Sequence, residues 1–113
     1  MIRVQTVADA APMDNPHGVE ARPLHDSEHA QVVHLTLGPG QGLRRHITPV
    51  DVCFYVLAGA GRVEIGDDAR EVAADALVES PAGVPHRWQN TGEDALRVLV
   101  VKTPRPTERT RLL

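Results

Sequence analysis

The amino-acid sequence predicts an all-β fold, a sandwich or barrel of short antiparallel strands. Nine glycines and nine prolines divide the 113 residues into short runs, as turns between strands do. Val is abundant, whereas the chain has one Phe, one Trp and one Tyr, which favours strands packed by aliphatic side chains. No long window carries a helical period. We expect eight or nine strands, little or no helix, and one domain, because a chain of this length forms a single folding unit.

The N-terminal third predicts three strands. Residues 2–7 alternate apolar and polar side chains, which is the pattern of a half-buried strand, and residues 8–18 form a loop. Residues 19–24 and 30–37 predict a hairpin across a polar turn. In the second strand of this hairpin, alternation places His34 on the face opposite to the neighbouring aliphatic side chains.

The middle of the chain predicts further strands. A Gly-Pro-Gly cluster at 38–40 breaks the chain before a short strand at 43–48. Residues 52–57 form a nearly continuous apolar run, and the glycines that follow predict a hairpin with the alternating residues 62–65. Residues 69–76 hold four Ala and are the only window that a helix could occupy. A helix of this length is marginal, so we assign strand and turn there.

The C-terminal part completes the strands and ends in a tail. Residues 87–89 and 95–102 are strand-like and are separated by a polar turn. From residue 103 onward, prolines and arginines predict a polar tail over 103–113. We therefore expect residues 1–113 to form one domain with this tail at its end.

Composition and charge exclude several classes of function. The formal net charge is -3 and the pI is about 6.0, so phosphate neutralisation does not recruit nucleic acid. No run of apolar residues approaches the length of a membrane helix. The single cysteine, Cys53, rules out an intrachain disulfide and favours a reducing, cytoplasmic setting. A small molecule or a second copy of the chain is the expected partner.

The residues 75–90 form the most informative stretch. Pro81, Gly83 and Pro85 predict a turn that delivers His86 to the start of a short strand. His46 lies forty residues upstream in a similar setting. An imidazole titrates near neutrality and binds metals, so these two side chains are the candidate site residues.

The same stretch resembles a motif of the cupin family, which consists of small jelly-roll β-barrels, also described as double-stranded β-helices. The second cupin motif reads Gly, five residues, Pro-x-Gly, two residues, His, three residues, Asn. Residues 81–83, His86 and Asn90 match it in register, and Asp75 stands where the family has its leading Gly. The resemblance therefore implies a cupin-type barrel.

The first cupin motif is kept only in part. It reads Gly, five residues, His-x-His, three or four residues, Glu, six residues, Gly. Gly40, His46 and Gly59 fit this spacing, whereas Thr48 replaces the second His and Val52 stands at the Glu position. The two motifs cover residues 40–90, and the flanking strands fit the same barrel.

The resemblance implies one divalent transition metal ion, Fe, Mn, Ni or Zn, held in the family by three His and one Glu. This chain keeps His46 and His86 and lacks the other two ligands. Two imidazoles leave most of the coordination sphere to water or substrate, which means weak binding. A metal-free pocket is the alternative, and the sequence leaves both open.

Three further side chains are candidate donors near these histidines. Asp51 precedes the Glu position by one residue, and a bulge there would complete a set of two His and one carboxylate. His34 could enter the barrel from a neighbouring strand if its polar face looks inward. Cys53 has no adjacent base and is interpreted as a small core residue.

Alternation extends the candidate pocket beyond the two histidines. From His46 it places Arg44 and Thr48 on one face, and from His86 it places Trp88 on the same face. Such a pocket would suit a small organic acid or a polar, sugar-like ligand. In the competing arrangement, Trp88 packs in the core and Arg44 points to solvent.

The remaining histidines of the N-terminal stretch are interpreted as solvated loop residues; they are His17, His25 and His29.

The function expected from these residues is small-molecule binding at His46 and His86. With a metal, the resemblance implies oxygenase or isomerase chemistry with the ion as Lewis acid. Without a metal, one histidine acts as general base. The alternative is a metal-free, non-catalytic ligand-binding or sensing module, and a structural barrel is a third. Apolar residues on both faces of 52–57 and 95–101 predict a homodimer, which is also common in the family.

Overall fold

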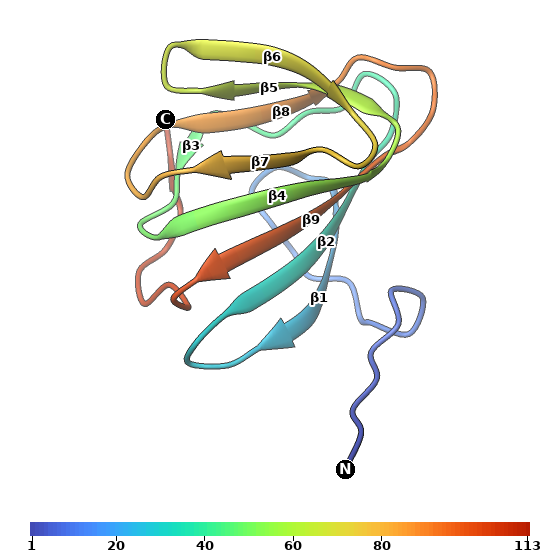
Figure 1. Ribbon diagram of the computed structural model, residues 1–113, viewed down its shortest axis with the longest axis vertical. Coiled ribbons are helices and arrows are strands. Elements are labelled where there is room, and N and C mark those ends of the chain that lie inside the picture. Colours follow the sequence, from blue (N-terminus) through green and yellow to red (C-terminus); the bar gives the residue numbers. More distant parts are fainter.

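A computed structural model describes residues 1–113 and contains two five-stranded antiparallel sheets and no helix (Figure 1). The first sheet has the order β1-β2-β9-β4-β7, and the second has the order β10-β3-β8-β5-β6. The strands are β1 (Glu20–Asp26), β2 (Gln31–Leu37), β3 (His46–Ile47), β4 (Asp51–Ala58), β5 (Ala60–Ile65), β6 (Asp68–Ala73), β7 (Leu77–Ser80), β8 (His86–Asn90), β9 (Leu96–Thr103) and β10 (Arg111–Leu112). The predicted all-β barrel is confirmed, with ten strands.

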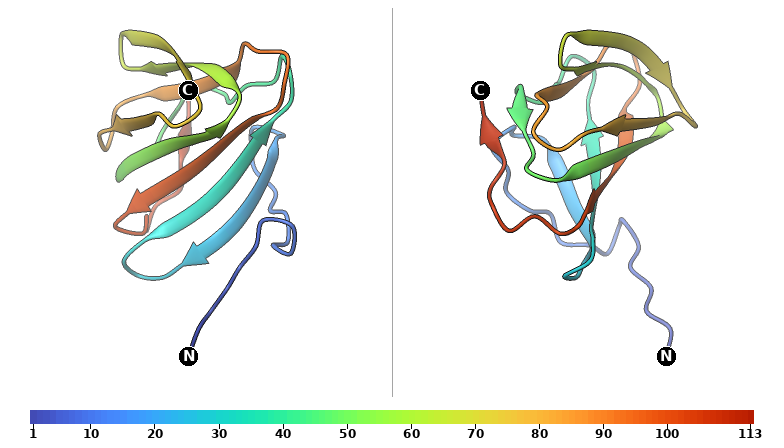
Figure 2. Two further views of the ribbon diagram at one scale, coloured as in Figure 1. Left: turned by 45° about the vertical axis from the view of Figure 1, so that its right-hand side comes forward. Right: turned by 60° about the vertical axis from the view of Figure 1, so that its left-hand side comes forward.

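The two sheets curl toward each other and enclose one core (Figure 2). Alternation along each strand sends every second side chain inward, which gives β4, β8 and β9 their regular pattern of buried and half-buried residues. Trp88 and Phe54 are the largest fully buried side chains. The aliphatic core around them comes from both sheets, so each sheet covers the inner face of the other.

Two hairpin predictions have different outcomes. The hairpin of β1 and β2 forms as expected. The predicted hairpin between residues 52–57 and 62–65 is wrong, because β4 pairs with β7 and β9 in the first sheet, whereas β5 pairs with β6 and β8 in the second. Gly59 carries the chain between the sheets with a φ of +84°. The glycine at this position therefore marks a corner between the two sheets and not a hairpin turn.

The chain ends also differ from the prediction. Residues 2–7 contain no strand, and the N-terminal residues project away from the barrel (Figure 1). The predicted strand at 43–48 is reduced to β3. Residues 103–113 were expected to be a polar tail, but they return to the barrel, where β10 pairs with β3 and Leu113 N donates to Arg45 O. Residues 69–73 of the window 69–76 belong to strand β6, in line with the strand assignment.

No element of the chain is a helix of the length and apolar character that would cross a lipid bilayer.

Candidate functional site

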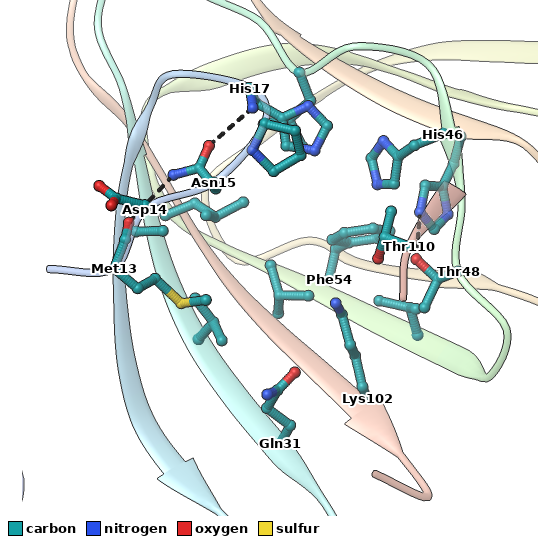
Figure 3. Close-up of a pocket in the computed structure, with 18 residues that line it drawn as sticks. Met13, Asp14, Asn15, His17, Gln31, His46, Thr48, Phe54, Lys102 and Thr110 are labelled. Carbon is teal, nitrogen blue, oxygen red and sulfur yellow. Dashed lines mark hydrogen bonds between the residues drawn. The ribbon is translucent and has the colours of Figure 1, made fainter. Parts of the chain in front are cut away.

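A cavity of about 180 Å³ lies between the two sheets (Figure 3). Its walls come from β2, β4 and β9 of the first sheet and from β3 and β8 of the second, and the loop at 13–17 closes one side. Most of the lining surface is apolar, and polar groups make up the smaller share. Concave, mainly apolar surfaces with a few polar groups are typical of small-molecule sites.

The four positions that hold a metal in the resembling family come together at this cavity. His46, Thr48, Val52 and His86 all line it and are nearly inaccessible to solvent. His46 and His86 face each other across the pairing of β3 and β8, and their ring centroids are 4.4 Å apart. The structure thus brings His46, Thr48 and His86, three of the residues predicted for the pocket, to one cavity, and Val52 lies with them.

The ring of His46 has one nitrogen available to a ligand. Its Nδ1 lies 2.6 Å from the carbonyl oxygen of Arg44, which can only accept, so Nδ1 carries the proton and donates. Nε2 then holds a lone pair and has no hydrogen-bond partner in the chain. Burial lowers the pKa of His46, while the Arg44 hydrogen bond opposes this effect. At neutral pH the side chain is an uncharged proton acceptor.

Both ring nitrogens of His86 are hydrogen-bonded to buried hydroxyl groups. Nδ1 lies 2.6 Å from Ser80 Oγ, and Nε2 lies 3.2 Å from Thr48 Oγ1. A hydroxyl group can donate or accept, so the neutral imidazole is satisfied in either tautomer. Burial, followed by the proximity of His46, lowers the pKa of His86 to about 3. His86 is therefore a fixed, neutral member of the site.

His17 is a site residue that the sequence prediction missed. It was interpreted as a solvated loop residue, but it lines the cavity, and its ring centroid lies 4.6 Å from that of His46. The backbone N–H of Arg44 donates to His17 Nδ1 at 2.9 Å, so Nε2 carries the proton. Burial, followed by His46, lowers the pKa of His17 to about 4. The neighbouring rings of His17 and His46 thus supply one neutral N–H donor and one free acceptor.

The loop around Asn15 holds His17 in place. Asn15 Oδ1 accepts from the backbone N–H of His17 at 3.0 Å, and Asn15 Nδ2 donates to the carbonyl of Val19 at 2.7 Å. An Asn side chain that bonds its own backbone in this way stabilises a tight turn. The sequence showed the turn-forming residues, but a loop has no periodicity that would indicate where its side chains point.

Lys102 and Gln31 are two more lining residues that sequence reasoning did not single out. They face each other across the pairing of β2 and β9. Burial lowers the pKa of Lys102. Alternation from Val98 and Val100 places Lys102 on the inner face of β9, so strand periodicity could have indicated it.

Two residues expected in the pocket lie elsewhere. Trp88 shares a face with His86, as predicted, but it is 0% exposed and packs in the core. The ring of Phe54 stands between them, with centroids 5.3 Å from His86 and 5.5 Å from Trp88, and forms the aromatic wall instead. The side chain of Arg44 is exposed, because residues 43–45 do not form a strand and alternation fails there.

The additional metal-ligand candidates also point away from the cavity. Asp51 is exposed, and its Oδ1 accepts from the backbone N–H of Ala82 at 2.8 Å, which holds the turn before His86. His34 lies on the outer face of β2, where its Nε2 accepts from Arg97 Nε at 3.1 Å. Cys53 is half-buried on the outward side of β4, so it is not a core residue.

The donor set does not fit a metal centre. No group of three or more His, Cys, Asp or Glu side chains is arranged to hold an ion. The nitrogens of His86 are engaged by hydroxyl groups, and His17 presents an N–H at Nε2. At the two remaining family positions, Thr48 offers only a weak metal ligand and Val52 offers none. The side chains at this cavity are therefore suited to binding an organic ligand directly and not to holding a metal ion.

The motif residues that do not face the cavity have a backbone role. Gly40, Gly59 and Gly83 all adopt positive φ, which L-residues rarely adopt. Asp75, at the family's Gly position, has a φ of +71°, and its Oδ1 accepts from the hydroxyl group of Tyr55 at 3.0 Å. Asp tolerates this conformation better than most residues. The substitution therefore preserves the turn.

Asn90, the last residue of the second motif, links three backbone segments. Its Nδ2 donates to the carbonyls of Leu37 and Asp94 at 2.9 and 2.8 Å, and its Oδ1 accepts from Gly92 N at 2.9 Å. A buried amide with all these partners fixes the end of β8.

The fold and the cavity define a class, the double-stranded β-helix barrel with a histidine-lined site between its sheets. The chain belongs to the cupin domain family, whose model matches residues 33–102, well over half of the chain. The resemblance seen in the two motifs is confirmed.

Individual relatives are similar over part or all of the chain. An uncharacterized Streptomyces coelicolor protein, SCO3923, is 39% identical over 54 residues, which is 48% of this chain and 50% of that protein. The structure of TT1209 from Thermus thermophilus has a TM-score of 0.79 at 28% identity, covering 93% of this chain and 100% of that one. The polyketide cyclase RemF from Streptomyces resistomycificus has a TM-score of 0.84 at 20% identity, covering 100% and 86%, and shows the fold alone.

Proposed function

We propose that this cupin binds a small organic molecule in the cavity at His46 and His86, with His46 as the group that exchanges a proton with it. The observation that carries the proposal is that a mainly apolar cavity holds two neighbouring neutral imidazoles, His46 with a free Nε2 acceptor and His17 with an N–H donor. A donor beside an acceptor matches a ligand hydroxyl or enolisable carbonyl group. Hydrogen bonds to two buried hydroxyl groups hold the ring of His86 in place at the cavity wall.

Catalysis would use His46 as a general base. A neutral imidazole within hydrogen-bond reach of a substrate proton accepts it, and the developing imidazolium is stabilised by the Arg44 carbonyl at Nδ1. The non-catalytic alternative uses the same contacts for binding or sensing alone. The loss of two family ligand positions, Thr48 and Val52, favours this metal-free site over a metal-dependent oxygenase or isomerase.

A thermal-shift screen of small hydroxy acids, phenols and ketones tests the proposal. A ligand present at 100 times its Kd stabilises the fold by about 2.7 kcal/mol, so binding gives a clear rise in Tm. We expect His46→Leu, which has no side-chain acceptor, to weaken such a ligand at least roughly 10-fold. His29→Ala is the control, because this imidazole is exposed on the β1–β2 turn. Equal shifts in wild type and His46→Leu would contradict the proposal.

We propose that the partner is a second copy of the chain, bound on the outer face of the first sheet. Leu77, Tyr55 and Leu99 form a row across β7, β4 and β9 on this face. Leu77 is 57% and Leu57 is 37% exposed, and a contiguous apolar face of this kind favours association.

The cytoplasmic setting stays a prediction from the cysteine content.

Light scattering at micromolar concentration tests the homodimer. We expect the mass of two chains for the wild type and of one chain for Leu77→Lys, because an exposed side chain can be replaced without disturbing the fold. A wild-type monomer would contradict the proposed dimer.

A further inference from the structure

Lys102 is the only lysine in the chain, and its side chain points into the cavity (Figure 3). It follows Val98 and Val100 on the inward face of β9 and is half-buried. None of the ion pairs of the chain involves it. All the other cationic side chains are arginines. A single ammonium group is therefore placed inside the candidate site without a counter-charge.

The cavity offers no anion that could pair with Lys102. Its only carboxylate is that of Asp14, which is exposed on the N-terminal loop and lies on the opposite side of the cavity (Figure 3). The histidines are neutral at pH 7, and Thr110 and Gln31 carry no charge. Taking an unpaired charge out of water is costly, so a positive group in such a place favours an anionic ligand.

We propose that the ligand of this cavity is a small organic acid whose carboxylate pairs with Lys102, an inference that rests on the proposed function of the cavity. Gln31 faces Lys102 across the β2–β9 pairing, and Thr110 also lines the cavity. An ammonium, an amide N–H and a hydroxyl group are all donors to carboxylate oxygens.

The remainder of the cavity limits the size and shape of this acid. Phe54, Val33 and Val100 form an apolar row across β4, β2 and β9, next to the row that holds Lys102, and all three line the cavity. An apolar cavity of roughly 150 Å³ holds one benzene ring. A volume of about 180 Å³ thus suits a single-ring or short-chain carboxylate, with any hydroxyl group at the histidine end.

The electrostatics of the site agree with this placement. Burial lowers the pKa of Lys102, and Lys102 contributes to the lowered pKa of both His46 and His86. A bound carboxylate would offset the positive potential that Lys102 exerts on the two histidines. The carboxylate would therefore change the electrostatic environment of both histidines as well as pairing with Lys102.

Matched pairs of acids and amides test the inference. Binding of benzoate against benzamide and of propionate against propionamide is measured by titration calorimetry at pH 7. A charge-assisted hydrogen bond is worth roughly 10- to 100-fold in affinity, and we expect the wild type to prefer each acid by that factor. Lys102→Met should lose the preference, Lys102→Arg should keep part of it, and Arg70→Gln, at an exposed position on β6, should keep all of it.

A second readout separates the role of Lys102 in binding from a structural one. Lys102→Met removes an unpaired charge from an apolar cavity, so the ligand-free variant should have a Tm roughly 4 °C or more above the wild type. Because there is one lysine, labelling of its ε-carbon gives a single NMR signal, which benzoate should shift.

The outcomes distinguish this inference from the proposed function. Benzamide binding as tightly as benzoate, or an acid preference that survives Lys102→Met, would overturn the inference and leave small-molecule binding intact. Failure of all four compounds and of the wider screen to bind would overturn both.

Discussion

Acidification from pH 7 to pH 4.5 is expected to lower the free energy of unfolding by roughly 3 kcal/mol. The buried His86 has a pKa of about 3 in the folded protein, against an ordinary value of 6.5 that applies to the unfolded chain. Between these two pH values, the imidazole of His86 is protonated in the unfolded chain but stays neutral in the folded protein. Stability from this group is therefore fully present above pH 6.5 and is lost progressively as the pH falls toward 3. His17, with a pKa of about 4, acts in the same direction but less, because it is half-exposed.

Urea unfolding at several pH values between 7 and 4.5 measures this effect. The window lies above the ordinary pKa of carboxyl groups, so histidines dominate the change. His86→Gln should be less stable at pH 7 but less sensitive to acid, whereas His29→Ala should keep the wild-type slope. A free energy of unfolding that stays constant down to pH 4.5 would show that the histidines are not held neutral by burial.

Gly59→Ala is expected to destabilise the fold by about 3 kcal/mol. Gly59 has a φ of +84°, and a Cβ there would lie 2.5 Å from Ala95 O and 3.0 Å from Leu96 Cα. Both contacts are with backbone atoms where the β9 segment begins, so no side-chain rotation relieves them. The substitution therefore forces β9, which carries Lys102, to shift relative to the corner between the sheets.

Gly40→Ala separates the two causes of this loss. Gly40 has a φ of +80°, but nothing lies within 4 Å of a Cβ at that position. Only the conformational cost remains, about 1 kcal/mol. Equal losses of stability for the two variants, measured by urea unfolding, would contradict the steric account of Gly59.

The fold class could be predicted from the sequence because the patterns that indicate it depend only on neighbouring residues. Alternation and turn-forming residues identify strands and loops, and the two motifs identify the barrel. Pairing is not local: the glycines at 59–61 look like a hairpin turn but carry the chain from one sheet to the other. The return of residues 111–112 to pair with β3 likewise depends on tertiary contacts that no propensity reports.

For the candidate site, strand periodicity and the two motifs indicated which residues lie near one another. His46, Thr48 and His86 all line the cavity. The position of His17 depends on the side-chain hydrogen bonds of a loop. Trp88 lies on the predicted face, but sequence cannot indicate its depth, and Phe54 takes the place at the cavity wall.

NMR of the imidazole nitrogens during titration with benzoate and the compounds of the thermal-shift screen tests whether His46 and His86 form a small-molecule site. We expect at least one compound to shift the signals of both His46 and His86 and to leave those of the exposed His29 unchanged. Compounds that bind while leaving His46 and His86 unshifted, or a screen in which none binds, would contradict it.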